Sequence, residues 1–131
     1  MNKVLYVIRG VPGCGKSTLA KELAGNNTFE ADQYFLSEGQ YKFDQAKLGE
    51  AHNSCKIRLL AAMQKGLTPL CVSNTTTTEK ELEPYLEYAK TYGYRAFVMV
   101  VENRHNGVNE HNVPEEVLVK MKEKLMGSIQ L

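Results

Sequence analysis

The sequence predicts an α/β fold with three layers, in which a small, mostly parallel sheet lies between helices on both of its faces. Short apolar segments alternate along the chain with segments whose apolar residues recur every three or four positions, which is typical of strands that alternate with helices. The length of 131 residues and the 43% of hydrophobic residues suit a single domain over residues 1–131 and exclude a disordered chain. Such strand–helix–strand units have right-handed crossovers, so the strands run parallel.

The first half of the chain supplies two predicted strands and two predicted helices. Residues 3–9 are rich in Val, Ile, Leu and Tyr, which predicts a strand buried on both faces. Residues 16–24 predict a helix that stops near a glycine, and the short apolar segment 29–35 is a candidate second strand. Residues 44–65 carry apolar side chains at helical spacing and end before Gly66, which predicts a long amphipathic helix.

The second half continues the alternation. Residues 68–73 predict a short buried strand, and residues 94–101 predict the last strand. The helix between them begins after Thr78, whose hydroxyl suits an N-cap. Residues 102–113 are polar and show no periodicity, and Pro114 opens a final helix.

Composition excludes several classes of protein. The formal net charge is +1, so no global positive field exists that would hold nucleic acid nonspecifically. Cys14, Cys55 and Cys71 form no C-x-x-C pair, which argues against a zinc site or a disulfide framework and fits a reducing compartment. No stretch reaches the roughly 18 apolar residues of a membrane span. We therefore expect a cytoplasmic protein with no membrane partner.

A glycine-rich segment lies between the first predicted strand and the first predicted helix. It has the sequence G-V-P-G-C-G-K-S, a complete G-x-x-x-x-G-K-S phosphate loop. The glycines let successive backbone N–H groups point at the phosphates of a nucleotide, and the helix N-terminus adds about half a positive charge. Lys16 adds a full charge, and the hydroxyl of Ser17 is suited to hold Mg²⁺. The sequence therefore predicts a P-loop NTPase fold with ATP and Mg²⁺ as cofactors. The predicted nucleotide-binding residues are Val11, Pro12, Gly13, Cys14, Gly15, Lys16, Ser17 and Thr18.

Asp32 is the candidate for the carboxylate that takes the proton of an acceptor hydroxyl in phosphoryl transfer. It lies at or just after the predicted second strand, and ligands of open α/β sheets bind beyond the carboxyl ends of the strands. The alternative is an ordinary turn residue. Asp44, in contrast, is predicted to cap a helix. The chain has no N-K-x-D motif, which argues against a switch GTPase.

Further motifs extend over nearly the whole chain. Besides the phosphate loop they are Ala31-Asp-Gln-Tyr-Phe35, Tyr41-Lys-Phe43, Glu50-Ala-His52, Arg58, Ser73-Asn-Thr75, Pro84-Tyr85, Asn103-Arg-His105 and His111-Asn-Val-Pro114. Together they resemble the small P-loop kinases of the polynucleotide 5′-hydroxyl kinase group, above all its Nedd4-binding-protein-2-like branch and short phage-encoded P-loop proteins.

The resemblance implies ATP- and Mg²⁺-dependent transfer of a phosphoryl group to the 5′-hydroxyl of RNA or DNA. By it, Asp32 matches the general base, Lys16 the phosphate lysine and Ser17 the magnesium-side serine. Arg104 matches the arginine of a lid over residues 102–113, and an arginine in a polar loop can close over a γ-phosphate. The predicted catalytic residues are Lys16, Asp32 and Arg104. The predicted substrate-binding residues are Tyr34, Arg58 and Asn74.

Two other functions stay open. A kinase for a small metabolite or a nucleotide sugar, similar to zeta toxins, is favoured by the near-zero net charge, because long polymers usually meet a basic groove. A non-transferring ATP-binding or ATPase module that acts through a partner stays open because Ser73 stands where such kinases often have an aspartate. Residues 52–54 form a single H-x-S segment, half of a two-histidine phosphoesterase site, which disfavours cyclic phosphodiesterase chemistry. The oligomeric state is left open.

Overall fold

In residues 2–37, 40–104 and 113–130, which the computed structural model describes, four strands form a parallel sheet in the order β2-β5-β1-β6. These strands are β1 (Lys3–Arg9), β2 (Thr28–Phe29), β5 (Leu70–Asn74) and β6 (Tyr94–Val100). The α-helices are α1 (Lys16–Ala24), α2 (Leu48–Gln64), α3 (Glu79–Tyr92) and α4 (Glu115–Ser128). The predicted α/β class with a small parallel sheet is confirmed.

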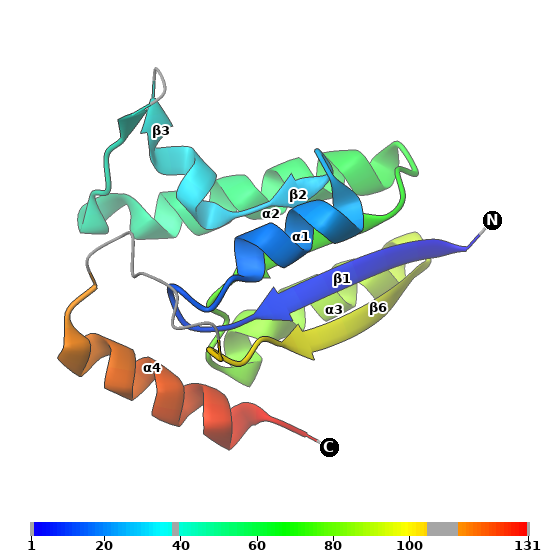
Figure 1. Ribbon diagram of the computed structural model, residues 1–131. Coiled ribbons are helices and arrows are strands. Elements are labelled where there is room, and N and C mark those ends of the chain that lie inside the picture. Colours follow the sequence, from blue (N-terminus) through cyan, green and yellow to red (C-terminus); the bar gives the residue numbers. More distant parts are fainter. Residues whose placement is uncertain (1, 38–39, 105–112, 131) are drawn as a thin grey trace.

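Helices cover both faces of the sheet, as the three-layer prediction requires (Figure 1). On one face, Ala20 of α1 packs with Ile8 and Cys71. On the other face, Leu59 of α2 and Leu82 of α3 belong to a larger cluster with apolar residues of β1 and β5. Because successive side chains of a strand point to opposite faces, β1 and β5 are buried on both.

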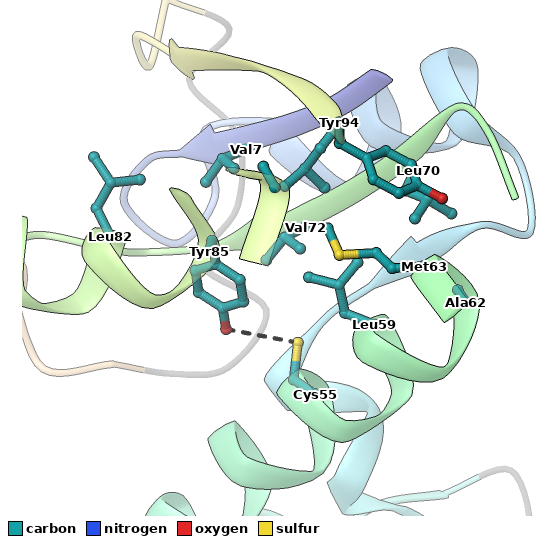
Figure 2. Close-up of a cluster of buried hydrophobic side chains, with 12 residues drawn as sticks. Val7, Cys55, Leu59, Ala62, Met63, Leu70, Val72, Leu82, Tyr85 and Tyr94 are labelled. Carbon is teal, nitrogen blue, oxygen red and sulfur yellow. Dashed lines mark hydrogen bonds between the residues drawn. The ribbon is translucent and has the colours of Figure 1, made fainter. Parts of the chain in front are cut away.

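The larger cluster forms the main core between the sheet and helices α2 and α3 (Figure 2). Within it, the hydroxyl of Tyr85 donates a hydrogen bond to Sγ of Cys55 at 3.9 Å. Burial raises the pKa of both groups, and it raises the pKa of Cys71, on the α1 face, to about 12. These side chains therefore stay protonated and act as packing residues at neutral pH.

The predicted second strand over 29–35 is wrong for most of its length. β2 ends at Phe29, and the 3₁₀ helix η1 (Ala31–Phe35) follows after one residue. The reason is a side-chain contact from another strand: the backbone N–H of Ala31 donates to Oδ1 of Asn74 at 2.8 Å instead of to a strand neighbour. The chain therefore turns out of the sheet at its carboxyl edge.

The segment between η1 and α2 holds elements that the sequence does not predict. β3 (Leu36–Ser37) and β4 (Gln40–Tyr41) form a short antiparallel pair. A second 3₁₀ helix, η2 (Gln45–Lys47), precedes α2, so the long helix begins later than predicted. Asp44 caps η2 by accepting a hydrogen bond from the N–H of Ala46 at 3.0 Å, which confirms its predicted capping role.

The second half agrees with the prediction to within a few residues. Thr78 is the N-cap of α3, and its Oγ1 accepts a hydrogen bond from the N–H of Glu81 at 3.3 Å. The Glu81 carboxylate accepts a hydrogen bond from the N–H of Thr77 at 2.9 Å in return. These two contacts, to the N-cap and to the residue before it, fix the start of α3 after β5.

α4 contributes little to the core. Leu125 is its buried residue, and a cavity of about 1040 Å³ separates the helix from α3 and β6. The predicted lid over 102–113 precedes this helix, and its residues 105–112 lie outside the described part of the chain. Among the described helices, none has the length and apolar character needed to span a bilayer.

Candidate active site

The loop between β1 and α1 has the backbone geometry that a phosphate loop needs. The N–H of Gly10 donates to the carbonyl of Thr75 at 3.3 Å, which ties the start of the loop to the end of β5. A Cβ on Gly10 would lie 2.5 Å from Sγ of Cys14, so a larger residue there would require the Cys14 side chain to shift. Gly13 and Gly15 have φ angles of 86° and 95°, in the left-handed region that glycine adopts without strain.

The first turn of α1 is open to an anion. No side chain caps this helix at Gly15, so its first backbone N–H groups face the loop without an acceptor from a capping side chain. Lys16 is partly buried, whereas Ser17 and Thr18 are exposed. The eight predicted nucleotide-binding residues therefore lie together in one loop and one helix N-terminus.

Glu30, the residue directly after β2, contacts the last residue of the phosphate-loop motif. The hydroxyl of Ser17 donates a hydrogen bond to Oε1 of Glu30 at 2.7 Å. Sequence analysis missed this residue, although the pattern E-A-D places a second carboxylate two positions before Asp32 at the end of the second strand. The contact joins the predicted metal ligand to the segment that carries the predicted base.

Two side chains from other elements hold η1, and with it Asp32, at the carboxyl edge of the sheet. Asn74 accepts the hydrogen bond from the N–H of Ala31 described above. Arg58 of α2 donates from Nη2 to the carbonyl of Glu30 at 3.0 Å and from Nη1 to Oε1 of Gln33. The position of Asp32 therefore depends on β5 and α2 as well as on its own short helix.

A small polar pocket lies beside this segment. It has a volume of about 120 Å³ and is lined by His52, Lys56, Asn74, Thr76, Glu81 and Tyr85. Burial lowers the pKa of His52, whereas the charges of Glu81 and Asp32 raise it. The charge of Asp32 therefore acts on His52, but burial is the larger effect and keeps the imidazole predominantly neutral at pH 7.

The predicted substrate-binding residues differ in what they contact. Tyr34 is 41% exposed, and its hydroxyl donates to Oε2 of Glu50 at 2.7 Å, which raises the pKa of Tyr34. Asn74 is buried, and its Oδ1 accepts the hydrogen bond from the N–H of Ala31. Besides its two contacts to η1, Arg58 donates from Nε to Oγ of Ser54 at 3.3 Å. Arg58 and Asn74 thus have positioning contacts within the protein, and their contacts to a substrate stay predictions.

Arg104 lies in the segment after β6. Its side chain is 81% exposed and pairs with Glu102, and this hydrogen bond raises the pKa of the guanidinium. Because the rest of the lid falls outside the described residues, closure of Arg104 over a nucleotide stays a prediction.

Arg9 is a buried cation at the end of β1 that sequence analysis also missed. Its Nε donates to the carbonyl of Thr76 at 2.8 Å, and its Nη2 donates to Oγ of Ser128 at 2.6 Å. Ser128 in turn donates to Oε1 of Glu79 at 2.8 Å. Thr76 has a φ of 44°, which is unusual for a residue other than glycine. Arg9, the residue before the phosphate loop, therefore joins the turn after β5 to the end of α4.

Residues 5–126 of the chain match the model of the AAA domain family AAA_33. The chain belongs to this family. Its AAA_33 domain is 38% identical over 96 residues to human NEDD4-binding protein 2, a match that spans 70% of this chain and 5% of that protein. It is 30% identical over 105 residues to mouse 2′,3′-cyclic-nucleotide 3′-phosphodiesterase, which spans 76% of this chain and 24% of that protein. The chain therefore covers less than a quarter of either relative.

Solved structures share the fold of this AAA_33 domain. A protein of Chloroflexus aurantiacus described as a candidate kinase superimposes with a TM-score of 0.60 at 14% identity, over 96% of this chain and 68% of that one. The APS kinase CysC of Mycobacterium tuberculosis superimposes with a TM-score of 0.53 at 12% identity, over 95% and 98% of the two chains. These superpositions confirm the predicted α/β fold, which the chain shares with both structures.

Proposed function

We propose that this chain transfers the γ-phosphoryl group of ATP to a hydroxyl, with the 5′-hydroxyl of RNA or DNA as acceptor. The observation that carries the proposal is the hydrogen bond between Ser17 and Glu30, at 2.7 Å, which joins the phosphate loop to the segment bearing Asp32. The resemblance of the sequence motifs to the polynucleotide 5′-hydroxyl kinase group, including short phage-encoded P-loop proteins, supports the choice of acceptor.

The phosphate loop and Lys16 bind the triphosphate in this proposal. The uncapped N–H groups at the start of α1 donate to phosphate oxygens, and the ammonium group of Lys16 stabilises the charge of the transferred group. Arg104 would add a second cation when the lid closes, which also excludes water from the γ-phosphate.

The residues around Ser17 fit a magnesium ion. Its exposed hydroxyl and the carboxylate of Glu30 are oxygen ligands of the kind that Mg²⁺ prefers. Oγ of Ser73, at the end of β5, is buried and has no hydrogen-bond partner among the described residues, so it is available to a water molecule of the ion. When bound, Mg²⁺ neutralises charge on the phosphates.

Asp32 acts as the general base on the acceptor. It accepts the proton of the hydroxyl as that oxygen attacks the γ-phosphorus and ADP leaves. The anchoring of η1 by Asn74 and Arg58 holds the carboxylate in place before the acceptor arrives, which lowers the cost of orienting it.

Two other activities are alternatives to phosphoryl transfer to a 5′-hydroxyl. Phosphodiesterase activity, named in one relative, has little support, because the H-x-S segment at 52–54 on α2 has no second copy in the sequence. A kinase for a small hydroxyl compound keeps support from the net charge of +1 and from the small polar pocket of about 120 Å³ beside η1.

The proposal is tested with γ-³²P-labelled ATP, Mg²⁺ and oligonucleotides that carry either a 5′-hydroxyl or a 5′-phosphate. We expect label on the 5′-hydroxyl form alone, and no label with the Lys16→Ala variant. A panel of small hydroxyl compounds is run in parallel. Label on a small compound alone would favour the metabolite kinase. ATP binding without any transfer would favour the non-transferring module.

Arg58 is expected to act by positioning η1. Replacement by Met removes its hydrogen bonds to Glu30, Gln33 and Ser54, so we expect kcat to fall about 100-fold, the effect of a misplacement of about 1 Å. ATP affinity should stay within about two-fold because the phosphate loop is untouched. Single-turnover kinetics and ATP titration measure both, and Lys65→Met, at the exposed end of α2, is the control. A raised KM for the acceptor with unchanged kcat would instead support the substrate contact predicted from the sequence.

A further inference from the structure

Residues 74–77, the β5–α3 segment, connect the phosphate loop to η1. Asn74, the last residue of β5, accepts a hydrogen bond from the N–H of Ala31, the first residue of η1, at 2.8 Å. The carbonyl of Thr75 accepts a hydrogen bond from the N–H of Gly10, the first residue of the loop motif, at 3.3 Å. The position of the phosphate loop relative to the predicted general base therefore depends on this segment.

The backbone of the β5–α3 segment is strained. Thr76 has a φ of 44°, in the left-handed region, and is 3% exposed. A β-branched residue is disfavoured there, and such a conformation persists only where its surroundings hold it. The carbonyl of Thr76 accepts a hydrogen bond from Nε of Arg9 at 2.8 Å, and the carbonyl of Thr75 is bound by Gly10. The peptide groups on both sides of the strained position are therefore held by residues at the start of the phosphate loop.

Arg9 is an unexpected residue at its position in β1. Leu5 and Val7 point to the same face of the strand and are fully buried. Arg9 is 2% exposed, and within the described part of the chain no carboxylate lies within ion-pair distance of it. Burying a guanidinium without a paired anion is costly, so packing alone would favour an apolar residue. The guanidinium instead supplies a planar set of donors that fixes the direction of its hydrogen bonds.

The second contact of Arg9 orients its guanidinium. Nη2 donates to Oγ of Ser128, at the end of α4, at 2.6 Å, and Ser128 donates to Oε1 of Glu79 at 2.8 Å. Because the guanidinium is planar and is bound at two of its nitrogens, Nε keeps its direction towards the carbonyl of Thr76.

We propose that Arg9 and Thr76 are positioning residues of phosphoryl transfer. Arg9 holds Thr76 in its strained conformation, and the β5–α3 segment then keeps the phosphate loop and Asp32 at the separation that the reaction needs. A displacement of about 1 Å between reacting groups can lower a rate about 100-fold, so neither residue has to touch a substrate. The effect on the rate rests on the proposed function, whereas the effect on the backbone depends on no acceptor.

The first test is Arg9→Met, which keeps most of the length of the side chain and removes both of its hydrogen bonds. The N–H groups of Gly10 and Ala31 report on the β5–α3 segment, because both donate to it. We expect hydrogen exchange of these two amides, followed by NMR, to become about 10-fold faster. The N–H of Cys71, which donates to the carbonyl of Asn27 at 3.0 Å, is the internal control and should change far less.

The same variant is expected to lower the single-turnover rate about 10- to 100-fold. The KM of the acceptor and the affinity for β,γ-imido-ATP should both stay within about three-fold, since neither ligand touches Arg9. The matched control is Arg95→Met, which makes the same change at an exposed position of β6 and should alter neither exchange nor rate.

Thr76→Gly tests the proposal without removing a buried cation. Glycine adopts a positive φ without strain, so we expect the melting temperature to hold. The two reporter amides should exchange faster and the rate should fall about 10-fold, because glycine no longer confines the segment to one conformation. A loss of rate without a loss of stability distinguishes positioning from a purely structural role.

Exchange at Gly10 and Ala31 that is unchanged, or that rises no more than at Cys71, would overturn the proposal. Faster exchange at both amides with an unchanged rate of transfer would overturn it as well. If the unaltered protein transfers phosphate to no acceptor, the proposed function alone is wrong, and exchange at the two amides still decides whether Arg9 holds the segment.

Discussion

Asp32→Asn is expected to lower the rate of phosphoryl transfer about 10²- to 10⁴-fold, the usual contribution of a general base. The amide cannot take the proton of the acceptor hydroxyl. ATP affinity should stay within about two-fold, because the phosphate loop and α1 do not depend on this carboxylate. Single-turnover transfer from labelled ATP measures the rate, and titration with β,γ-imido-ATP measures the affinity.

The matched control for this variant is Asp44→Asn. Asp44 caps η2 away from the phosphate loop, and Asn is an equally good cap, so activity and stability should both be retained. Slow ATP turnover that Asp32→Asn leaves unchanged would contradict the role of Asp32. It would then favour an ATP-hydrolysing module that acts through a partner.

Leu59→Ala is expected to lower the free energy of unfolding by about 2–5 kcal/mol, the range seen for large-to-small changes in a packed core. Leu59 is 0% exposed and lies between α2 and the sheet in the main cluster (Figure 2). Truncation would leave a cavity among Met63, Leu70 and Val72 that these neighbours only partly fill. Urea unfolding followed by circular dichroism measures the change.

Ile57→Ala, two positions earlier on the same helix, is the control. Ile57 is 63% exposed, so its replacement should change the free energy of unfolding by no more than about 0.5 kcal/mol. Equal effects of the two variants would contradict the orientation of α2. Since α2 also carries Arg58, this orientation determines whether the helix can hold η1.

The parts of the fold that sequence analysis predicted correctly have local causes. β1 and α1 begin and end where predicted, because a run of apolar β-formers, a phosphate loop and a glycine mark their boundaries within a few residues. The prediction failed at 31–35, where apolar residues suggested a strand. There, Oδ1 of Asn74 accepts a hydrogen bond from the N–H of Ala31, and the backbone forms η1 instead of a strand. Ala31 and Asn74 are 43 positions apart, so the residues around Ala31 do not indicate this contact.

The candidate site also contains residues that motifs predict and residues that only the structure reveals. Lys16, Ser17 and Asp32 were predicted from motifs and from their places at strand ends, and their roles stay predictions. Glu30 and Arg9 were missed, because each has its role through a partner that the motif does not contain. Arg58 was predicted to bind the substrate, whereas its contacts within the protein favour a role in positioning η1.

The amino-acid sequence by itself determined the alternation of strands and helices and the phosphate loop, because glycine conformations and apolar periodicity act over a few neighbouring residues. Only the tertiary structure decided that Glu30 contacts Ser17, that Arg58 and Asn74 hold η1, and that Arg9 is buried and contacts Thr76. These contacts exist because the parallel order β2-β5-β1-β6 brings the carboxyl ends of separate strands to one edge. That order depends on the packing of the whole core.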